Sequence, residues 1–146
     1  MIKINYPLIK PKIRRSENSE EIFCIIRKKW LVITPEEWVR QNFLLFLIHE
    51  LKYSASLIAV EKKICIGEIN RRFDIVVYSK NTEPLIVVEC KEMEVALNEA
   101  TILQVLRYNT ALQAKFLVVT NGVSCAAFEN RTFGFVEIQN MPPNNI

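Results

Sequence analysis

The spacing of hydrophobic residues predicts a helix that begins directly after Thr34. Apolar side chains recur every three or four residues at Val39, Phe43, Phe46, Leu47 and Leu51, with Leu44 and Ile48 beside them. This stripe is broader than a coiled-coil seam, so we expect the helix to pack against a sheet. Thr34 fits the N-cap, Pro35 the first helical position and Glu37 position N3 of a capping box. The helix is expected to end near residues 52–56.

Three segments rich in β-branched and aliphatic residues follow, at residues 58–66, 73–78 and 85–90. The polar run 79–84 separates the last two and has the composition of a turn. Together they predict a meander of antiparallel strands.

A second helix is predicted from the N-cap Asn98 to about Gln113. Its apolar and small positions are Ile102, Leu103, Val105, Leu106, Leu112, Ala100, Ala111 and Ala114. Residues 116–120 then form an almost wholly apolar run, bounded by Asn121 and Gly122, which is typical of a central strand. A helix between two strands indicates a crossover, so this strand is expected to run parallel to the one before the helix.

The two ends of the chain have weaker patterns. Residues 1–33 predict a short hairpin and a basic connector, which form an arm packed on the core. Residues 124–128 and 133–138 predict a closing hairpin, and residues 140–146 a frayed tail. The sequence therefore predicts one α/β domain over residues 34–139, in the order helix, three strands, helix, strand.

Composition is consistent with a single globular domain. The chain has 146 residues, of which 50% are hydrophobic and 24% charged. The net charge is only +3, but basic residues bunch at Arg14-Arg15, Arg27-Lys28-Lys29, Lys62-Lys63 and Arg71-Arg72. Such bunching suits a polyanion, whereas a solvated protein surface is the alternative for each cluster. Charge alone does not distinguish the two.

The cysteines and the hydropathy exclude several classes of protein. Cys24, Cys65, Cys90 and Cys125 include no Cys-x-x-Cys pair, and the chain has a single histidine, so no zinc-binding pattern is present. No apolar run approaches the roughly 18 residues of a membrane span. Nothing in the sequence resembles a secretory signal. We therefore expect a cytoplasmic protein without a membrane role.

Charged residues at the ends of two apolar strands are the best indication of function. Asp74 stands at the head of one strand, and Glu89 and Lys91 stand at the end of the next. Such groups are almost never fully buried unless they are paired or hold a metal. Glu89 and Lys91 share a strand face, about 6.6 Å apart. If the two strands are neighbours, two carboxylates and an amine converge, which predicts a hard-cation site with a built-in amine.

This arrangement resembles the PD-(D/E)xK nuclease superfamily, and more narrowly the N-terminal nuclease domain of the R subunit of type I restriction enzymes. The matching segments are Thr34-Pro-Glu-Glu-Trp-Val-Arg-Gln41, Asp74-Ile-Val-Val-Tyr78, Ile86-Val-Val-Glu-Cys-Lys91, Gln104-x-x-x-Tyr108 and Val119-Thr-Asn-Gly122. The resemblance implies a restriction-endonuclease-like core. Phe73 replaces the proline of the superfamily name. R subunits continue into an ATP-driven translocase, so we expect a standalone domain rather than a complete restriction enzyme.

The resemblance also implies the chemistry, which is hydrolysis of DNA phosphodiester bonds with Mg²⁺, for which Mn²⁺ can substitute. Asp74 and Glu89 would hold the metal, and the backbone carbonyl of Cys90 would add a ligand. Lys91 would position or help to deprotonate the attacking water and stabilise the developing charge.

Further candidates come from the second helix and from the basic clusters. Gln104 and Tyr108 lie one turn apart on one helix face, with Arg107 beside them. The resemblance implies that Gln104 orients the site and that Tyr108 supports it or contacts nucleic acid. A solvent-facing helix edge is the alternative. Arg107, Arg71 and Arg72 are further candidates for contacts with nucleic acid.

The first helix supplies one more acidic candidate. Related nucleases often carry an acid here that points at the metal, and Glu36 is the better choice because Glu37 fits the capping box. Acids in a first turn are, however, also favoured by the helix dipole alone, by about 0.3–1 kcal/mol. His49 has no partner in the sequence and is expected to be a partly exposed helix residue. Trp30 and Trp38 are expected to cover the edge of the core, with stacking on unpaired bases as the alternative.

Three functions remain open on the sequence alone. The first is a Mg²⁺-dependent endonuclease acting on DNA. The second is a DNA-binding or assembly module that keeps the nuclease fold and needs a partner, which the modest net charge favours. The third is the same chemistry on RNA. By resemblance, the candidate partners are DNA, a second copy of the chain and the subunits of a restriction-modification system.

Overall fold

A mixed sheet of seven strands forms the centre of the molecule in the computed structural model, which describes residues 1–144. Its strands are β1 (Ile2–Lys3), β5 (Ile58–Ile66), β6 (Ile69–Tyr78), β7 (Pro84–Cys90), β8 (Phe116–Thr120), β9 (Ser124–Arg131) and β10 (Gly134–Ile138). They lie in the order β1-β9-β8-β7-β6-β5, with β10 also paired to β9. The meander β5-β6-β7 is antiparallel, and β8 runs parallel to β7, as the sequence predicts.

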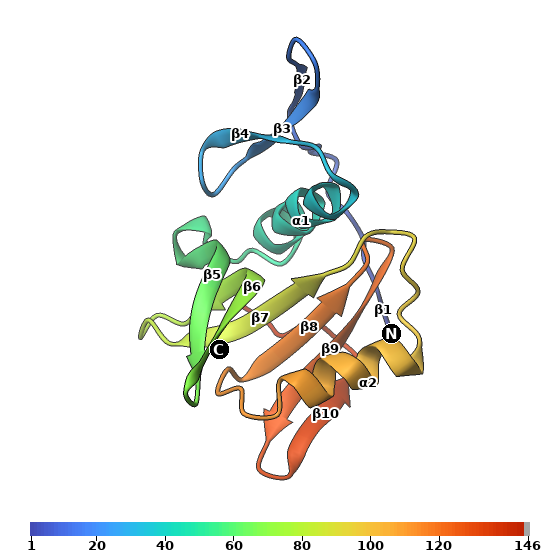
Figure 1. The fold of residues 1–146 in the computed structure, drawn as a ribbon. Coiled ribbons are helices and arrows are strands. Elements are labelled where there is room, and N and C mark those ends of the chain that lie inside the picture. The colour runs from blue at the N-terminus through green and yellow to red at the C-terminus, as the bar shows by residue number, and fades with distance from the viewer. Residues whose placement is uncertain (145–146) are drawn as a thin grey trace.

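The N-terminal arm is larger than the expected hairpin. It forms a second, antiparallel sheet of β2 (Ile13–Arg15), β3 (Glu20–Cys24) and β4 (Lys29–Val32). Ile22 and Cys24 alternate inward along β3 and are fully buried, which anchors this small sheet. Helix α1 (Pro35–Leu45) lies between the small sheet and the large one (Figure 1).

Helix α1 begins where its capping residues predict. The Glu37 N–H donates to the Thr34 hydroxyl at 3.0 Å, and Pro35 occupies the first turn. The helix continues as a π-helical turn, η1 (Phe46–Glu50), and a short 3₁₀ turn, η2 (Ala55–Leu57), leads into β5. The capping box is incomplete, because the Glu37 carboxylate accepts from Arg40 and Gln41 instead of reaching back to Thr34.

Helix α2 (Glu99–Tyr108) is the crossover between β7 and β8, capped by the Asn98 side chain on the Thr101 N–H at 2.9 Å. It ends five residues before the predicted Gln113. Asn109 ends it, because its buried side chain donates to the Val105 carbonyl at 2.8 Å.

Two hydrophobic clusters, one on each face of the large sheet, form the core. The cluster under α1 includes Phe43, Leu47, Ile75, Val88 and Cys90. The cluster under α2 includes Val105, Phe73, Val76, Val87 and Leu117. The two helices therefore cover opposite faces, and the strand ends between them can present side chains to either side.

The C-terminal segment is docked rather than frayed over residues 140–144, and residues 145–146 of the predicted tail lie outside the described part. Pro142 is buried and its carbonyl accepts from the Tyr53 hydroxyl. The Asn144 side chain donates to the Lys52 carbonyl at 2.7 Å. Across residues 1–144, no helix is long and apolar enough to cross a membrane.

Candidate active site

Asp74, in the middle of β6, and Glu89, near the end of β7, lie on neighbouring strands, but their carboxylates serve opposite faces of the sheet. Ile75 is paired with Val88 in the register of β6 and β7, so both acids occupy the next position. Glu89 falls between Val88 and Cys90, which belong to the cluster under α1, so regular alternation turns Glu89 toward α2. Asp74 instead contacts Arg40 of α1.

A local irregularity accounts for the orientation of Asp74. Phe73 packs under α2 and Ile75 under α1, although residues two apart on a regular strand share a face. The facing position in β5 is Glu61, which has a φ of 49°. Both strands therefore depart from regular geometry at this point, and Asp74 turns to the α1 side.

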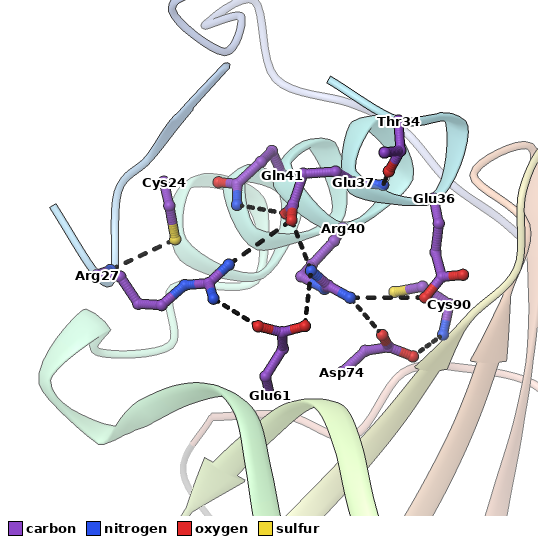
Figure 2. Close-up of polar contacts among 10 residues, drawn as sticks. All are labelled: Cys24, Arg27, Thr34, Glu36, Glu37, Arg40, Gln41, Glu61, Asp74 and Cys90. Carbon is purple, nitrogen blue, oxygen red and sulfur yellow. Dashed lines mark hydrogen bonds and ion pairs between the residues drawn. The ribbon is translucent and has the colours of Figure 1, made fainter. Parts of the chain in front are cut away.

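Both oxygens of Asp74 are engaged. Oδ1 accepts from Arg40 Nη2 at 2.7 Å, and Oδ2 accepts from the Cys90 N–H at 2.8 Å (Figure 2). The side chain is only 18% exposed. Asp74 therefore connects β6 to β7 and to α1.

Arg40 lies at the centre of a buried charge network and is itself only 5% exposed. Besides Asp74, its guanidinium meets Glu37 at 2.7 Å, Glu36 at 3.5 Å and Glu61 at 3.8 Å. Burial works against the charge on Arg40, but Asp74 and Glu37 outweigh it and raise its pKa. The guanidinium is therefore a fixed positive charge among four carboxylates.

Arg27 closes the same network from the small-sheet side. It donates to Glu61 at 2.6 Å and lies 3.6 Å from Glu37. Part of the basic cluster Arg27-Lys28-Lys29 thus neutralises acids inside the molecule and is unavailable to a polyanion.

Glu36 lies at the exposed edge of this network. Burial and then the negative charge of Asp74 raise the pKa of Glu36, while Arg40 and Lys91 oppose the shift. Glu36 and Asp74 are two carboxylates that repel each other, and the Lys91 ammonium lies near them. Their oxygens are the donors that a hard divalent cation prefers, and such a cation would relieve the repulsion. The Cys90 thiol is not such a donor, because burial raises its pKa well above the usual value.

Glu89 belongs to a separate set of contacts on the α2 side. Its Oε1 accepts from Asn109 at 3.3 Å and from Arg71 at 3.4 Å. Arg71 also donates to the Tyr108 carbonyl at 2.8 Å, and its guanidinium lies 4.4 Å from the centre of the Tyr108 ring. Arg71 therefore connects the end of β7 to the end of α2.

A cavity of about 170 Å³ opens between these elements. It is lined by Arg71, Glu89, Lys91, Gln104, Val105 and Tyr108. In the described part of the chain, the Lys91 ammonium takes part in no ion pair within 4.0 Å. The cavity thus brings a carboxylate, an amine and an amide together, which is a set able to hold a phosphate and a water molecule.

Other candidates from the sequence lie apart from this cavity. Asp74 and Glu36 are in the Arg40 network, Arg72 lines a neighbouring groove, and Arg107 faces a different hollow near β10. Residues 1–144 contain no group of three or more acidic, cysteine or histidine side chains arranged to hold a metal.

Arg40, Asn109 and Glu61 were not among the sequence candidates. Arg40 follows Glu36 and Glu37 by one helical turn, a spacing that usually indicates surface ion pairs. The available signal was its place beside Val39 and Phe43, on a helix with a broad apolar stripe.

Comparison with known protein families identifies a relationship. The family model described as type I restriction enzyme R protein N terminus matches residues 35–142, which include every residue of the cavity and of the Arg40 network except Arg27. No curated protein matches the chain.

Proposed function

We propose that this chain, which belongs to the family of type I restriction enzyme R protein N-terminal domains, is a Mg²⁺-dependent endonuclease that hydrolyses DNA phosphodiester bonds. The observation that carries the proposal is the cavity in which Glu89, Lys91 and Gln104 meet, with Asp74 on the neighbouring strand β6. This function requires the restriction-endonuclease-like core that the resemblance implies for this chain.

Asp74 and Glu36 would hold the Mg²⁺ from the α1 side with the Cys90 carbonyl, and Glu89 would join them by leaving its contacts with Arg71 and Asn109. Bound there, the metal would supply positive charge to the reacting phosphate. The carboxylates fit this role by their chemistry, since oxygen donors are the ligands that Mg²⁺ prefers.

Lys91 is the residue that would act on the attacking water. Lys91 lines the cavity, and among residues 1–144 its ammonium has no ion-pair partner within 4.0 Å, so it can hold a water molecule in line with the phosphate and stabilise the charge that develops. Gln104 would orient that water or a phosphate oxygen through its amide. Arg71 and Tyr108 border the same cavity and would contact the nucleic acid.

One observation favours the second candidate, a DNA-binding or assembly module that needs a partner. Arginine contacts both acids, Asp74 at 2.7 Å and Glu89 at 3.4 Å. A protein with internally neutralised carboxylates can keep this fold without binding a metal. Binding of DNA or of other restriction-modification subunits would then be the function.

Cleavage of labelled DNA separates the two candidates. Supercoiled, linear and single-stranded DNA would be incubated with the wild type and with Lys91→Ala in Mg²⁺ or Mn²⁺. Loss of a proton-transfer group lowers a rate by about 10²–10⁴-fold, so we expect the variant to be inactive. Lys80→Ala, an exposed loop lysine, is the matched control and should cut like the wild type.

Equal cleavage by the wild type and Lys91→Ala would overturn the proposed chemistry. Binding of DNA with no cleavage over a wide range of protein concentration would favour the module. A parallel RNA substrate identifies the nucleic acid that is cut.

A further inference from the structure

A groove of about 540 Å³ continues from the candidate active site along the outside of the molecule. Its walls come from the tip of the β5–β6 hairpin and from the end of α2, and they include Ile69, Thr110 and Ala111. Arg71 and Tyr108 line both the groove and the smaller cavity, so the two spaces are adjacent. A group bound in the groove would therefore lie next to a phosphate bound at Lys91.

Tyr108 is held in a fixed position with a large surface left open. Arg71 covers one side of its ring at 4.4 Å from the ring centre. Two bonds fix that guanidinium, one to the Tyr108 carbonyl at 2.8 Å and one to Glu89 at 3.4 Å. Tyr108 is nevertheless 68% exposed. Since Arg71 covers one side, this exposure leaves room for a partner on the other side of the ring.

The opposite wall of the groove is apolar and equally open. Ile69 is 67% exposed, and Ile66 beside it reaches into the cluster under α2. A single exposed isoleucine needs no explanation. An exposed isoleucine and an exposed tyrosine on the two sides of one groove, next to an arginine, make a slot for a flat aromatic group.

The charges around the groove indicate that this group belongs to a polyanion. On the β5–β6 hairpin, the exposed Lys63 is paired directly with the exposed Arg72. Like charges in facing positions destabilise a pair of strands. An anion bound along the hairpin would remove this repulsion. Arg71 is paired with Glu89, so the positive charge at the groove comes from Arg72 and Lys63, with Lys91 in the adjacent cavity.

We propose that the groove is a stacking site for one unpaired nucleobase of the strand that is cut. The inference rests on the proposed nuclease function and specifies its substrate class. A base in a continuous duplex has both faces covered by its neighbours, whereas an unpaired base offers a free face to an aromatic side chain. The preferred substrate therefore has unpaired nucleotides beside the cut phosphate, in a single strand, a flap or a frayed end.

The test is a binding measurement without metal, on proteins that also carry Lys91→Ala so that no cleavage occurs. Fluorescence anisotropy would give the affinity for a labelled single-stranded oligonucleotide and for the duplex of the same sequence. Stacking contributes about 1–3 kcal/mol per base, which corresponds to about 5–150-fold in affinity. Tyr108→Ala should weaken single-strand binding within that range and change duplex binding less than about twofold. Tyr108→Trp should preserve it.

Phe133→Ala is the control, because Phe133 is a fully exposed aromatic residue in the turn between β9 and β10. It should leave both affinities unchanged. Ile69→Ser tests the opposite wall and should also weaken binding of the single strand alone. Thermal unfolding of each variant shows whether the fold is kept, and Ile69→Ser tests the groove even if Tyr108→Ala is unstable.

The inference is overturned if Tyr108→Ala leaves single-strand binding unchanged, or weakens single-strand and duplex binding equally. Its failure is distinct from failure of the nuclease proposal. A protein that never cuts but loses single-strand affinity in Tyr108→Ala keeps the stacking site. A protein that cuts through Lys91, with equal affinity of wild type and Tyr108→Ala for single strands, keeps only the nuclease.

Discussion

The two faces of the sheet at Asp74 and Glu89 differ in whether their charged groups are paired within the protein or open to a cavity. On the α1 side, Arg40 is 5% exposed and meets four carboxylates, so these acids are paired within the protein. On the α2 side, a cavity separates Glu89 and Lys91 from α2, and Tyr108 is 68% exposed. The same sheet thus carries a structural charge cluster on one face and an open set of groups on the other. Mutations on the first side should mainly change stability, and those on the second mainly binding.

Replacing the central guanidinium should have the largest effect. Arg40→Met leaves Glu37 and Asp74 without their partner in a buried setting, and breaking such a pair costs about 3–5 kcal/mol of unfolding free energy. Urea unfolding at pH 7 measures it. Arg14→Met is the control, because Arg14 bonds Glu21 at 2.9 Å but its side chain is 51% exposed, so the expected loss is below about 1 kcal/mol. Equal losses in the two variants would contradict the contrast between buried and open charge.

Mg²⁺ should stabilise the wild type if acids from both faces of the sheet bind the same cation. A ligand present at 100 times its dissociation constant adds about 2.7 kcal/mol to the free energy of unfolding. Asp74→Asn should remove this increment, whereas Lys91→Ala should keep it. The increments are compared within each protein, with and without Mg²⁺, because Asp74→Asn also weakens the contact with Arg40. A full increment in Asp74→Asn would show that Asp74 is not a ligand.

Asn109→Ala should have an intermediate effect on stability, because Asn109 supports both the end of α2 and Glu89 of the cavity. Its side chain is fully buried and donates to the Val105 carbonyl at 2.8 Å and to Glu89 at 3.3 Å. Leaving these acceptors without a donor should lower the unfolding free energy by about 1–2 kcal/mol. Asn81→Ala, in the exposed turn between β6 and β7, should stay within about 0.5 kcal/mol. If both variants match the wild type in chemical denaturation, Asn109 does not hold the end of α2.

The smallest expected effect is a dependence of stability on pH from Glu61. Partial burial raises the pKa of Glu61, but Arg40 and Arg27 outweigh it and lower the value below 4.5. The folded protein therefore binds this proton less readily than the unfolded chain, so the stabilisation is present above pH 4.5 and is lost as the pH falls through the lowered pKa.

Urea midpoints of the wild type and Glu61→Gln, measured from neutral to acidic pH, should converge on the acidic side. Glu36 has the opposite sign, because its raised pKa makes it destabilising as the pH rises above 4.5. Comparing the two proteins at each pH cancels that contribution. Parallel curves would show that the network does not depend on the charge of Glu61.

Local signals in the sequence predicted much of the fold. Thr34 and Pro35 fixed the start of α1 because an N-cap and a first-turn proline act within a few residues. The run 116–120 was predicted as a central strand, and all five of its residues are buried. The order of helices and strands followed from such segments and from the lengths of the connections between them.

The orientation of Asp74 and the role of Arg40 could not be read in this way. Assigning side chains to alternate faces assumes a regular strand. The irregularity at Asp74 and Glu61 turns Asp74 to the face opposite the one that alternation predicts. Arg40 is a polar residue on a helix, and its contact with Asp74 joins positions 34 residues apart. Its burial depends on tertiary contacts with Glu61, Arg27 and the small sheet, which no local pattern specifies.

The pairing of β1 with β9 has a consequence for how the protein is made. Ile2 is paired with Cys125, so β1 finds its partner only after more than 120 further residues have been synthesised. Contacts this distant in sequence slow folding, because a long loop must close before they form. During translation, β1 therefore stays without its partner strand until β9 has been synthesised. Because β10 pairs with residues 127–131 of β9, only the start of β9, at Ser124 and Cys125, depends on β1 for a partner.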